Sequence, residues 1–135
     1  MAILGIDYGE KRVGLALAES PIDLPLPYKM IENKDESALL NEIKTIVEDE
    51  FVTEIVVGLP IKESGEPGTG AAEISKFVEH LKERFKETKV MTIDERYTSR
   101  LADSLSLEQG VQRDVGSAMI ILDDYLKRLT SDQKL

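Results

Sequence analysis

The stretch AILGIDYGEKRVGLALA, residues 2–18, decides the fold. Two short apolar runs, Ala2–Asp7 and Val13–Ala18, flank the polar link Tyr8–Arg12. Apolar runs of this length on either side of a glycine-containing turn are typical of two paired strands. We therefore predict an antiparallel hairpin at this point. A third, weaker strand is predicted at Tyr28–Ile31, after a proline-rich link. Because proline lacks an amide hydrogen, this strand should lie at a sheet edge.

Helices and strands alternate in the segments that follow. Glu36–Glu50 repeats its apolar residues at the spacing of one helical face. Glu54–Gly58 is a short apolar strand of the kind buried in a parallel sheet. After a glycine-rich loop, a second helix is predicted over Ala71–Phe85 and a fifth strand over Lys89–Ile93. Such crossovers require a parallel half of the sheet. The prediction is an α/β fold with a five-stranded mixed sheet and helices on both faces.

The last quarter of the sequence is predicted to be helical. Thr98 or Ser99 can cap a helix that runs to about Glu108, and Asp114 opens a final helix with an apolar face. The polar residues 130–135 are predicted to fray. We expect residues 1–135 to form a single domain.

Composition narrows the class of protein. The 135 residues are 41% hydrophobic and 32% charged, which suits one folded domain. No apolar run approaches the ~18 residues that cross a bilayer, and no signal-like core precedes Asp7, so we expect a cytoplasmic protein without a membrane partner. The lack of cysteine excludes disulfides, thiolate metal sites and a cysteine nucleophile.

The formal net charge of -9 argues against a nonspecific binder of polyanions, because phosphate contacts need lysine and arginine. The local charge at a binding site matters more than the total. Six of the seventeen basic residues lie in or beside the segments that carry candidate site residues: Lys11, Arg12, Lys62, Arg96, Arg100 and Arg113.

Acidic residues stand where predicted elements end or begin. Asp7 ends the first strand, Asp94 and Glu95 follow the fifth, and Asp114 begins the last helix. Carboxyl ends of parallel strands share one edge, so three acids can converge there. Hard oxygen ligands without a histidine suit Mg²⁺ or Mn²⁺, and a pair of such ions about 4 Å apart supports phosphodiester hydrolysis. We predict a metal-dependent hydrolase of this kind.

Each of these acids also has a structural interpretation. Asp7 can be a plain turn aspartate, and Asp114 can be only a helix N-cap. Asp94 and Glu95 are neighbours in an extended chain, so only one can face Asp7, and spacing does not choose between them.

Other polar residues are expected to have ordinary roles. His80 is predicted to be a solvated surface residue, and Asp123 and Asp124 to lie on the polar face of the last helix. The loop Gly65–Gly70 fits either an idle turn or a lid that grips a substrate.

Five motifs, in order, resemble the YqgF family, the RuvC-like Holliday junction resolvases that are also described as pre-16S rRNA nucleases. The motifs are GIDYG at 5–9, KRVG at 11–14, VVGLP at 56–60, DERYTS at 94–99, and Asp114 ahead of SA at 117–118 and IIL at 120–122. The resemblance covers nearly the whole chain. It implies a ribonuclease-H-like fold and a cytoplasmic nuclease that matures the 5′ end of small-subunit ribosomal RNA.

The resemblance also implies residue roles. The family's catalytic and metal-binding acids match Asp7, Glu95 and Asp114, which selects Glu95 over Asp94. Basic positions that can hold a phosphate lie next to this site, and the substrate-binding set is Lys11, Arg12, Arg96 and Thr98. The expected partners are precursor ribosomal RNA, or branched DNA, with a possible ribosomal partner. RuvC-like enzymes that cut four-way junctions work as symmetric dimers, so the chain is expected to be a monomer or a homodimer.

Two other functions fit parts of the sequence. GIDYG before a hairpin also resembles the phosphate loop of actin-like and sugar-kinase ATPases, but these need a second lobe that 135 residues cannot supply. A non-catalytic RNA-binding module for ribosome assembly would keep the fold without the chemistry. The presence of all three acids counts against that alternative.

Overall fold

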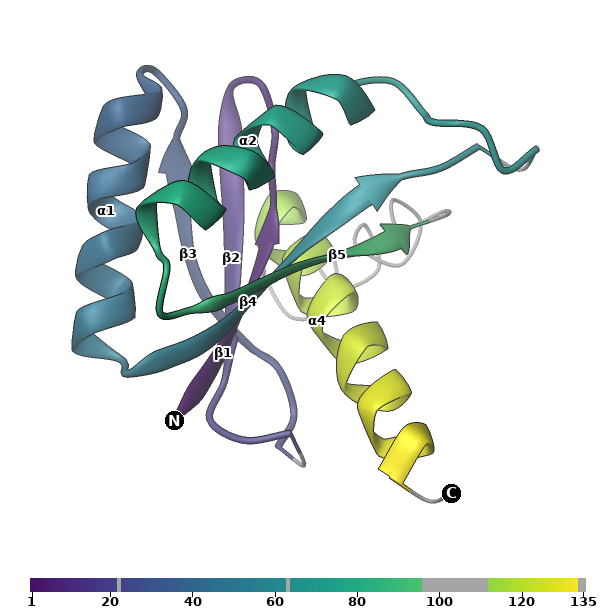
Figure 1. Cartoon of the computed structure of the whole chain (residues 1–135). Coiled ribbons are helices and arrows are strands. Elements are labelled where there is room, and N and C mark those ends of the chain that lie inside the picture. The colour runs from purple at the N-terminus through teal and green to yellow at the C-terminus, as the bar shows by residue number, and fades with distance from the viewer. Residues whose placement is uncertain (22, 63, 96–111, 134–135) are drawn as a thin grey trace.

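The computed structural model describes residues 1–21, 23–62, 64–95 and 112–133. The elements follow in the order β1 (Ala2–Asp7), β2 (Arg12–Ala18), β3 (Leu26–Glu32), α1 (Glu36–Asp49), β4 (Val52–Pro60), α2 (Ala71–Arg84), β5 (Lys89–Glu95) and α4 (Arg113–Gln133) (Figure 1). The helix predicted from Thr98 to Glu108 lies outside the described residues, and so do the side chains of Arg96 and Arg100.

The described strands form one five-stranded sheet with the order β3-β2-β1-β4-β5. β1 pairs antiparallel with β2, and β2 pairs antiparallel with β3, which confirms the hairpin and the edge position of the proline-containing strand. β4 runs parallel to both β1 and β5. The predicted mixed sheet is therefore confirmed, with an antiparallel half and a parallel half that meet at β1.

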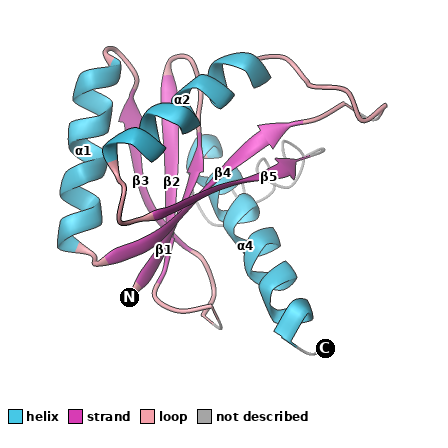
Figure 2. Cartoon of the chain, viewed as in Figure 1, coloured by secondary structure: helices cyan, strands magenta, loops and turns pink. Residues whose placement is uncertain are grey.

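Helices cover both faces of the sheet, as predicted. α1 and α2 lie together on one face, and α4 crosses the other (Figure 2). Residues that alternate along β1 enter different cores: Leu4 and Ile6 pack beneath α1 and α2, whereas Ile3 packs beneath α4. Strands that are apolar on both faces are what such a three-layer arrangement requires. None of the described helices is both long and apolar enough to cross a membrane.

Most observed boundaries lie within two residues of those predicted, and two of the differences bear on the acidic residues. β5 continues through Asp94 and Glu95, because its ladder with β4 extends to the pairs Leu59–Asp94 and Pro60–Glu95. The acids therefore end the strand rather than follow it. The second difference is α4, which begins at Arg113, one residue earlier than predicted, and remains helical through Gln133.

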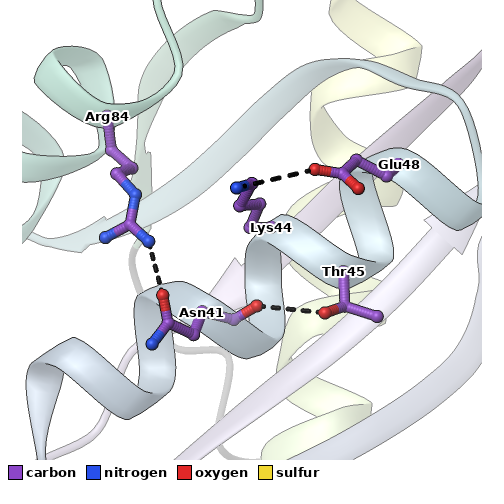
Figure 3. Close-up of polar contacts among 5 residues, drawn as sticks. All are labelled: Asn41, Lys44, Thr45, Glu48 and Arg84. Carbon is purple, nitrogen blue, oxygen red and sulfur yellow. Dashed lines mark hydrogen bonds and ion pairs between the residues drawn. The ribbon is translucent and has the colours of Figure 1, made fainter.

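Polar contacts join α1 to α2 on the outer surface. Arg84 donates to the side-chain oxygen of Asn41, whose backbone carbonyl accepts from the hydroxyl of Thr45 at 3.2 Å (Figure 3). His80 Nδ1 contacts Glu36 Oε1 in the first turn of α1, and both side chains are 39% exposed. His80 is therefore a partly exposed surface residue, in keeping with the prediction, and it also contacts Glu36 where α2 lies against the start of α1.

Candidate functional site

The parallel half of the sheet brings two of the predicted acids to one edge. Asp7 is the last residue of β1 and Glu95 is the last residue of β5. Both strands pair with β4 and run in the same direction, so their carboxyl ends face the same way. One strand separates them, which corresponds to about 10 Å across the sheet. This edge is where open α/β sheets usually place their ligands.

Glycines allow α4 to approach this edge. A Cβ atom added to Gly14 of β2 would lie 1.9 Å from the backbone oxygen of Asp114, and one added to Gly5 of β1 would lie 2.8 Å from Cβ of Leu122. The helix thus rests almost directly on the sheet backbone. Asp114, in the first turn of α4, is consequently held against the end of the β1–β2 hairpin.

Asp7 and Asp114 share a pocket of about 430 Å³. Its lining consists of Asp7, Arg12, Met30, Gln112, Arg113, Asp114 and Ser117. Burial, and next the negative charge of Asp114, raise the pKa of Asp7 to about 6 against the opposing effects of a Ser117 hydrogen bond and the Arg113 charge. The two carboxylates are therefore close enough to repel each other, and positive charge at the pocket offsets part of that repulsion.

Arg12 supplies part of that charge. Its Nε lies 3.3 Å from Oδ2 of Asp114, with side-chain exposures of 63% for Arg12 and 28% for Asp114. The predicted substrate-binding arginine thus lies at the mouth of the pocket that holds two predicted metal ligands. Lys11 is exposed in the preceding turn and does not line this pocket. Arg96 and Thr98 lie outside the described residues.

Glu95 lies beside the pocket with different neighbours. Burial, and then the charge of Asp124 and a hydrogen bond to it, raise the pKa of Glu95 to about 8, with a smaller contribution from Asp7. Its Oε1 is buried and has no hydrogen-bond partner among the described residues. Oδ2 of Asp124 in turn lies 3.2 Å from Nη2 of Arg128. The Glu95 carboxyl is therefore directed toward the middle of α4 rather than into the pocket.

Of the three acids expected to converge, Asp7 and Asp114 thus share the pocket, and Glu95 lies beside it. Among the described residues, no three acidic or histidine side chains lie close enough together to hold one metal ion. The donor set nevertheless fits a hard divalent cation, because Asp7 and Asp114 repel each other and a buried oxygen of Glu95 has no partner.

Two residues near the acids had no predicted role in the site. Ser117 is 8% exposed and hydrogen-bonds to Asp7, and Asp124 holds Glu95. Helical spacing could have predicted both residues. Ser117 lies three residues after Asp114, and Asp124 lies seven residues after Ser117, so all three share one face of the helix. Asp123 pairs with exposed Lys127 at 2.9 Å, in keeping with its predicted place on the polar face.

A purely structural role, as a turn aspartate for Asp7 or a helix N-cap for Asp114, does not account for where these two residues lie. Asp114 lies inside the first turn of α4, after Arg113, rather than at the residue before the helix. Asp7 is half-buried beneath α4 instead of exposed in a turn. Neither position is explained by local chain geometry alone.

The glycine-containing loop that follows β4 starts next to Glu95. The backbone amide of Ile61 donates to the Glu95 carbonyl at 3.1 Å, and Ile61 then bridges to Pro67. The loop extends away from the sheet as a narrow arm (Figure 1). Its predicted role as a turn or a lid stays a prediction.

Comparisons with known proteins agree with this architecture. Residues 1–128 match a family model described as "RuvX: Holliday junction resolvase". Two relatives named "Putative pre-16S rRNA nuclease" come from Maridesulfovibrio salexigens and Bacteroides thetaiotaomicron. The first is 34% identical, covering 95% of this chain and 99% of its own length. The second is 37% identical, covering 93% and 95% respectively.

Two solved structures share the fold at low identity. T. thermophilus RuvC in complex with a Holliday junction substrate superposes with a TM-score of 0.64 at 12% identity, covering 96% of both chains. The fowlpox virus Holliday junction resolvase gives a TM-score of 0.62 at 13% identity, covering 96% of this chain and 99% of its own. These likenesses confirm the RuvC-like, ribonuclease-H-like fold. The match to the family model over residues 1–128, together with the relatives that are 34% and 37% identical over nearly their full length, shows that the chain belongs to the RuvX family, also called YqgF.

Proposed function

We propose that this protein is a metal-dependent nuclease that hydrolyses phosphodiesters in precursor 16S ribosomal RNA, in the cytoplasm. The observation that carries the proposal is the shared pocket of Asp7 and Asp114 at the carboxyl end of β1, with Glu95 beside it. The relatives named for pre-16S rRNA support the choice of substrate.

In this proposal Asp7, Glu95 and Asp114 hold Mg²⁺ or Mn²⁺. A bound ion of this type supplies Lewis acidity and neutralises charge that develops on phosphate oxygens. The paired acids explain why a cation would bind here, since the negative charge of Asp114 raises the cost of ionising Asp7.

The protein's own basic residues would position the substrate. Arg12 lies at the mouth of the pocket, where its guanidinium can donate two hydrogen bonds to one phosphate. Arg113 also lines the pocket. This local arrangement offsets the net charge of -9 where a nucleic-acid backbone would lie. Lys11, Arg96 and Thr98 are proposed as further substrate contacts.

A second candidate substrate is a four-way DNA junction. It is favoured by the family model's description and by the fold shared with RuvC bound to a junction. A symmetric junction requires two cuts related by a twofold axis, so this activity would need a homodimer. The oligomeric state in solution therefore helps to separate the two candidates.

The deciding experiment compares end-labelled precursor small-subunit RNA with a synthetic four-way DNA junction, with Mn²⁺, Mg²⁺ or chelator. The variants are Asp7→Asn and, as a matched control, Asp94→Asn, which changes an exposed aspartate at the same sheet edge. We expect metal-dependent RNA cleavage that Asp7→Asn abolishes and Asp94→Asn retains.

Other results would change the assignment. Cleavage of the junction alone would make the protein a resolvase. RNA binding that Asp7→Asn leaves intact, without cleavage of either substrate in any metal, would favour a non-catalytic assembly module or an enzyme that needs a ribosomal partner.

A further inference from the structure

A second groove lies beside the candidate site, between the start of β3 and α4. Its volume is about 410 Å³, within the range of small-ligand sites. Leu24 and Leu26 on one wall are 77% and 62% exposed, so no described part of the chain covers them. We call this feature the apolar groove, and its lining consists of Leu24, Pro25, Leu26, Pro27, Met119, Ile120 and Asp123.

The apolar groove continues the candidate pocket along the same two elements. On β3, Met30 lines the candidate pocket, and Pro27, three residues earlier, lines the groove. On α4, Ser117 lines the pocket, and Met119, two residues later, lines the groove. The two hollows are therefore neighbouring parts of one trough that leads away from the predicted metal ligands.

The length of this trough fits a few nucleotides. A strand advances about 3.3 Å per residue, so Met30 and Pro27 lie roughly 10 Å apart along β3. A helix rises about 1.5 Å per residue, so Asp114 and Ile120 lie about 9 Å apart along α4. A stacked nucleic-acid strand advances about 3.4 Å per nucleotide. A strand whose scissile phosphate lies at Asp114 therefore reaches the groove within about three nucleotides.

The lining of the groove favours a nucleobase over a phosphate. Asp123 is the only charged residue in the described lining, and Lys127, its partner at 2.9 Å, is engaged by that carboxylate. A phosphate inside the groove would meet negative charge and no basic residue of the lining. The face of a base is uncharged and packs on apolar side chains whatever its sequence. Bases are therefore expected to face the groove while the phosphates face solvent.

We propose that the apolar groove binds an unpaired base of the RNA strand close to the scissile phosphate. A base in a duplex is stacked and turned toward its partner strand, so it cannot enter such a groove unless it is first extruded. The groove would thus make the enzyme select single-stranded segments over duplex arms. This inference rests on the proposed nuclease function, since it assigns the groove to the substrate of the same site.

A second copy of the chain fits the groove less well. Two chains that each carry a net charge of -9 repel each other, and the described lining offers no basic residue to offset this repulsion. An RNA strand is also highly charged, but Arg12 and Arg113 at the adjoining pocket can hold its phosphates. The continuity with that pocket therefore favours the substrate strand.

The test measures binding of the full chain to three synthetic probes in the presence of chelator. The probes are a single-stranded RNA of mixed sequence, the same strand annealed to its complement, and a strand of equal length with abasic residues throughout. We expect the single-stranded RNA to bind most tightly and to shift the methyl resonances of Leu24, Leu26 and Ile120. The abasic strand carries the same phosphates, so it isolates the contribution of the bases.

The double variant Leu24→Asn/Leu26→Asn removes the apolar wall. It should weaken binding of the single-stranded RNA by about tenfold and leave binding of the abasic and duplex probes unchanged. Because both leucines are exposed, its melting temperature should equal that of the wild type. Phe51→Asn is the matched control, since it removes an apolar side chain that is 73% exposed at the far end of β1. It should bind all three probes like the wild type.

Several results would overturn the proposal. They are single-stranded binding by the double variant equal to that of the wild type, an equal loss of affinity for the abasic strand, and methyl shifts centred elsewhere. A wild-type dimer that the double variant dissociates would also overturn it, because the occupant would be a second copy.

The result also separates the groove from the nuclease function, because chelator removes cleavage from the binding assay. Metal-dependent RNA cleavage together with unaltered binding by the double variant would overturn the groove alone. Base-dependent binding at the leucines, without cleavage of RNA in any metal, would overturn the nuclease function and support the groove as a base-binding site.

Discussion

Arg12 and Asp114 meet across the mouth of the candidate site, with Nε of the arginine 3.3 Å from Oδ2 of the aspartate. One residue begins β2 and the other lies in the first turn of α4, so the pair forms only when the helix is seated on the sheet. The arginine is 63% exposed, and an exposed pair of this kind adds less than about 1 kcal/mol to stability. The pair matters because either the Arg12 guanidinium or a bound divalent ion can neutralise the charge of Asp114.

Removing Arg12 should make metal binding tighter and substrate binding weaker. In Arg12→Gln the guanidinium no longer competes with a divalent ion for Asp114, and the phosphate contact is lost. We expect Mn²⁺ to bind several-fold more tightly, as measured by electron paramagnetic resonance. We expect RNA to bind more weakly, as measured in the presence of chelator. Lys127→Gln, which breaks an ion pair with Asp123 further along α4, is the control. Weaker Mn²⁺ binding by Arg12→Gln would contradict the expectation.

Asp7→Asn should stabilise the metal-free protein at neutral and alkaline pH. The pKa of Asp7 rises from 3.8 to about 6 on folding. Between these values the folded state retains a proton that the unfolded state has lost, so stability falls as pH rises through this window. The penalty is complete above about pH 6 and is at most roughly 3 kcal/mol. Asparagine never ionises, so it avoids this penalty.

The measurement is urea unfolding in chelator at pH 4 and at pH 8. We expect Asp7→Asn to gain roughly 2 kcal/mol over the wild type at pH 8 and much less at pH 4. Asp94→Asn, on the exposed side of β5, should show no such difference. An Asp7→Asn variant that is less stable than the wild type at pH 8 would mean that the carboxylate is stabilised in the fold.

Much of this fold can be predicted from local sequence, because the apolar patterns are strong. The hairpin around the turn Tyr8–Arg12 and the amphipathic α1 and α2 were predicted close to their observed ends. The end of β5 was predicted early, since Asp94 and Glu95 are polar and their strand pairing depends on β4, a long-range partner. Propensity within a short window does not contain that information.

The site could be predicted only in part. The acids themselves stand out because they interrupt apolar strand ends or open a helix. Which neighbours each carboxyl contacts depends on how closely α4 approaches the sheet, and this is set by glycines on two strands, Gly5 and Gly14. The contact between Glu95 and Asp124 follows from that approach. Strand spacing also does not determine whether Asp94 or Glu95 of β5 faces Asp7. Only the resemblance to the family favoured Glu95.

Metal affinity should rise with pH over an unusually wide range. Asp7 and Glu95 have pKa values raised to about 6 and about 8, so a cation must displace a proton from Glu95 at neutral pH and from Asp7 as well below about pH 6. We expect the Mn²⁺ dissociation constant to fall between pH 5 and pH 9, with proton release on binding detected by calorimetry in buffers of different ionisation enthalpy.

Glu95→Gln separates the two acids in this titration. It should remove the part of the pH dependence near pH 8, weaken Mn²⁺ binding, and leave the part near pH 6. Asp94→Asn should titrate like the wild type. A Glu95→Gln variant with an unchanged profile would show that Glu95 does not contact the ion.

The close approach of α4 gives the last prediction. In Gly14→Ala the new Cβ would lie 1.9 Å from the backbone oxygen of Asp114, and a backbone atom cannot move aside without moving the helix. We expect a loss of roughly 3 kcal/mol in unfolding free energy, in the range of overpacking and strain, together with displaced Asp114. Mn²⁺ affinity and cleavage should therefore fall even in the folded fraction.

Gly58→Ala is the matched comparison on β4. Its Cβ would lie 2.4 Å from Cδ1 and 2.8 Å from Cγ1 of Ile121, a side chain that can change rotamer, and 3.3 Å from Cγ of Glu95. We expect a smaller loss of stability, about 1–2 kcal/mol, and a smaller loss of Mn²⁺ affinity than in Gly14→Ala, because the backbone at Asp114 is not contacted. Chemical denaturation and Mn²⁺ binding measured on both variants decide the matter. If Gly14→Ala binds Mn²⁺ as tightly as Gly58→Ala does, the position of Asp114 does not depend on contact between α4 and the sheet at Gly14.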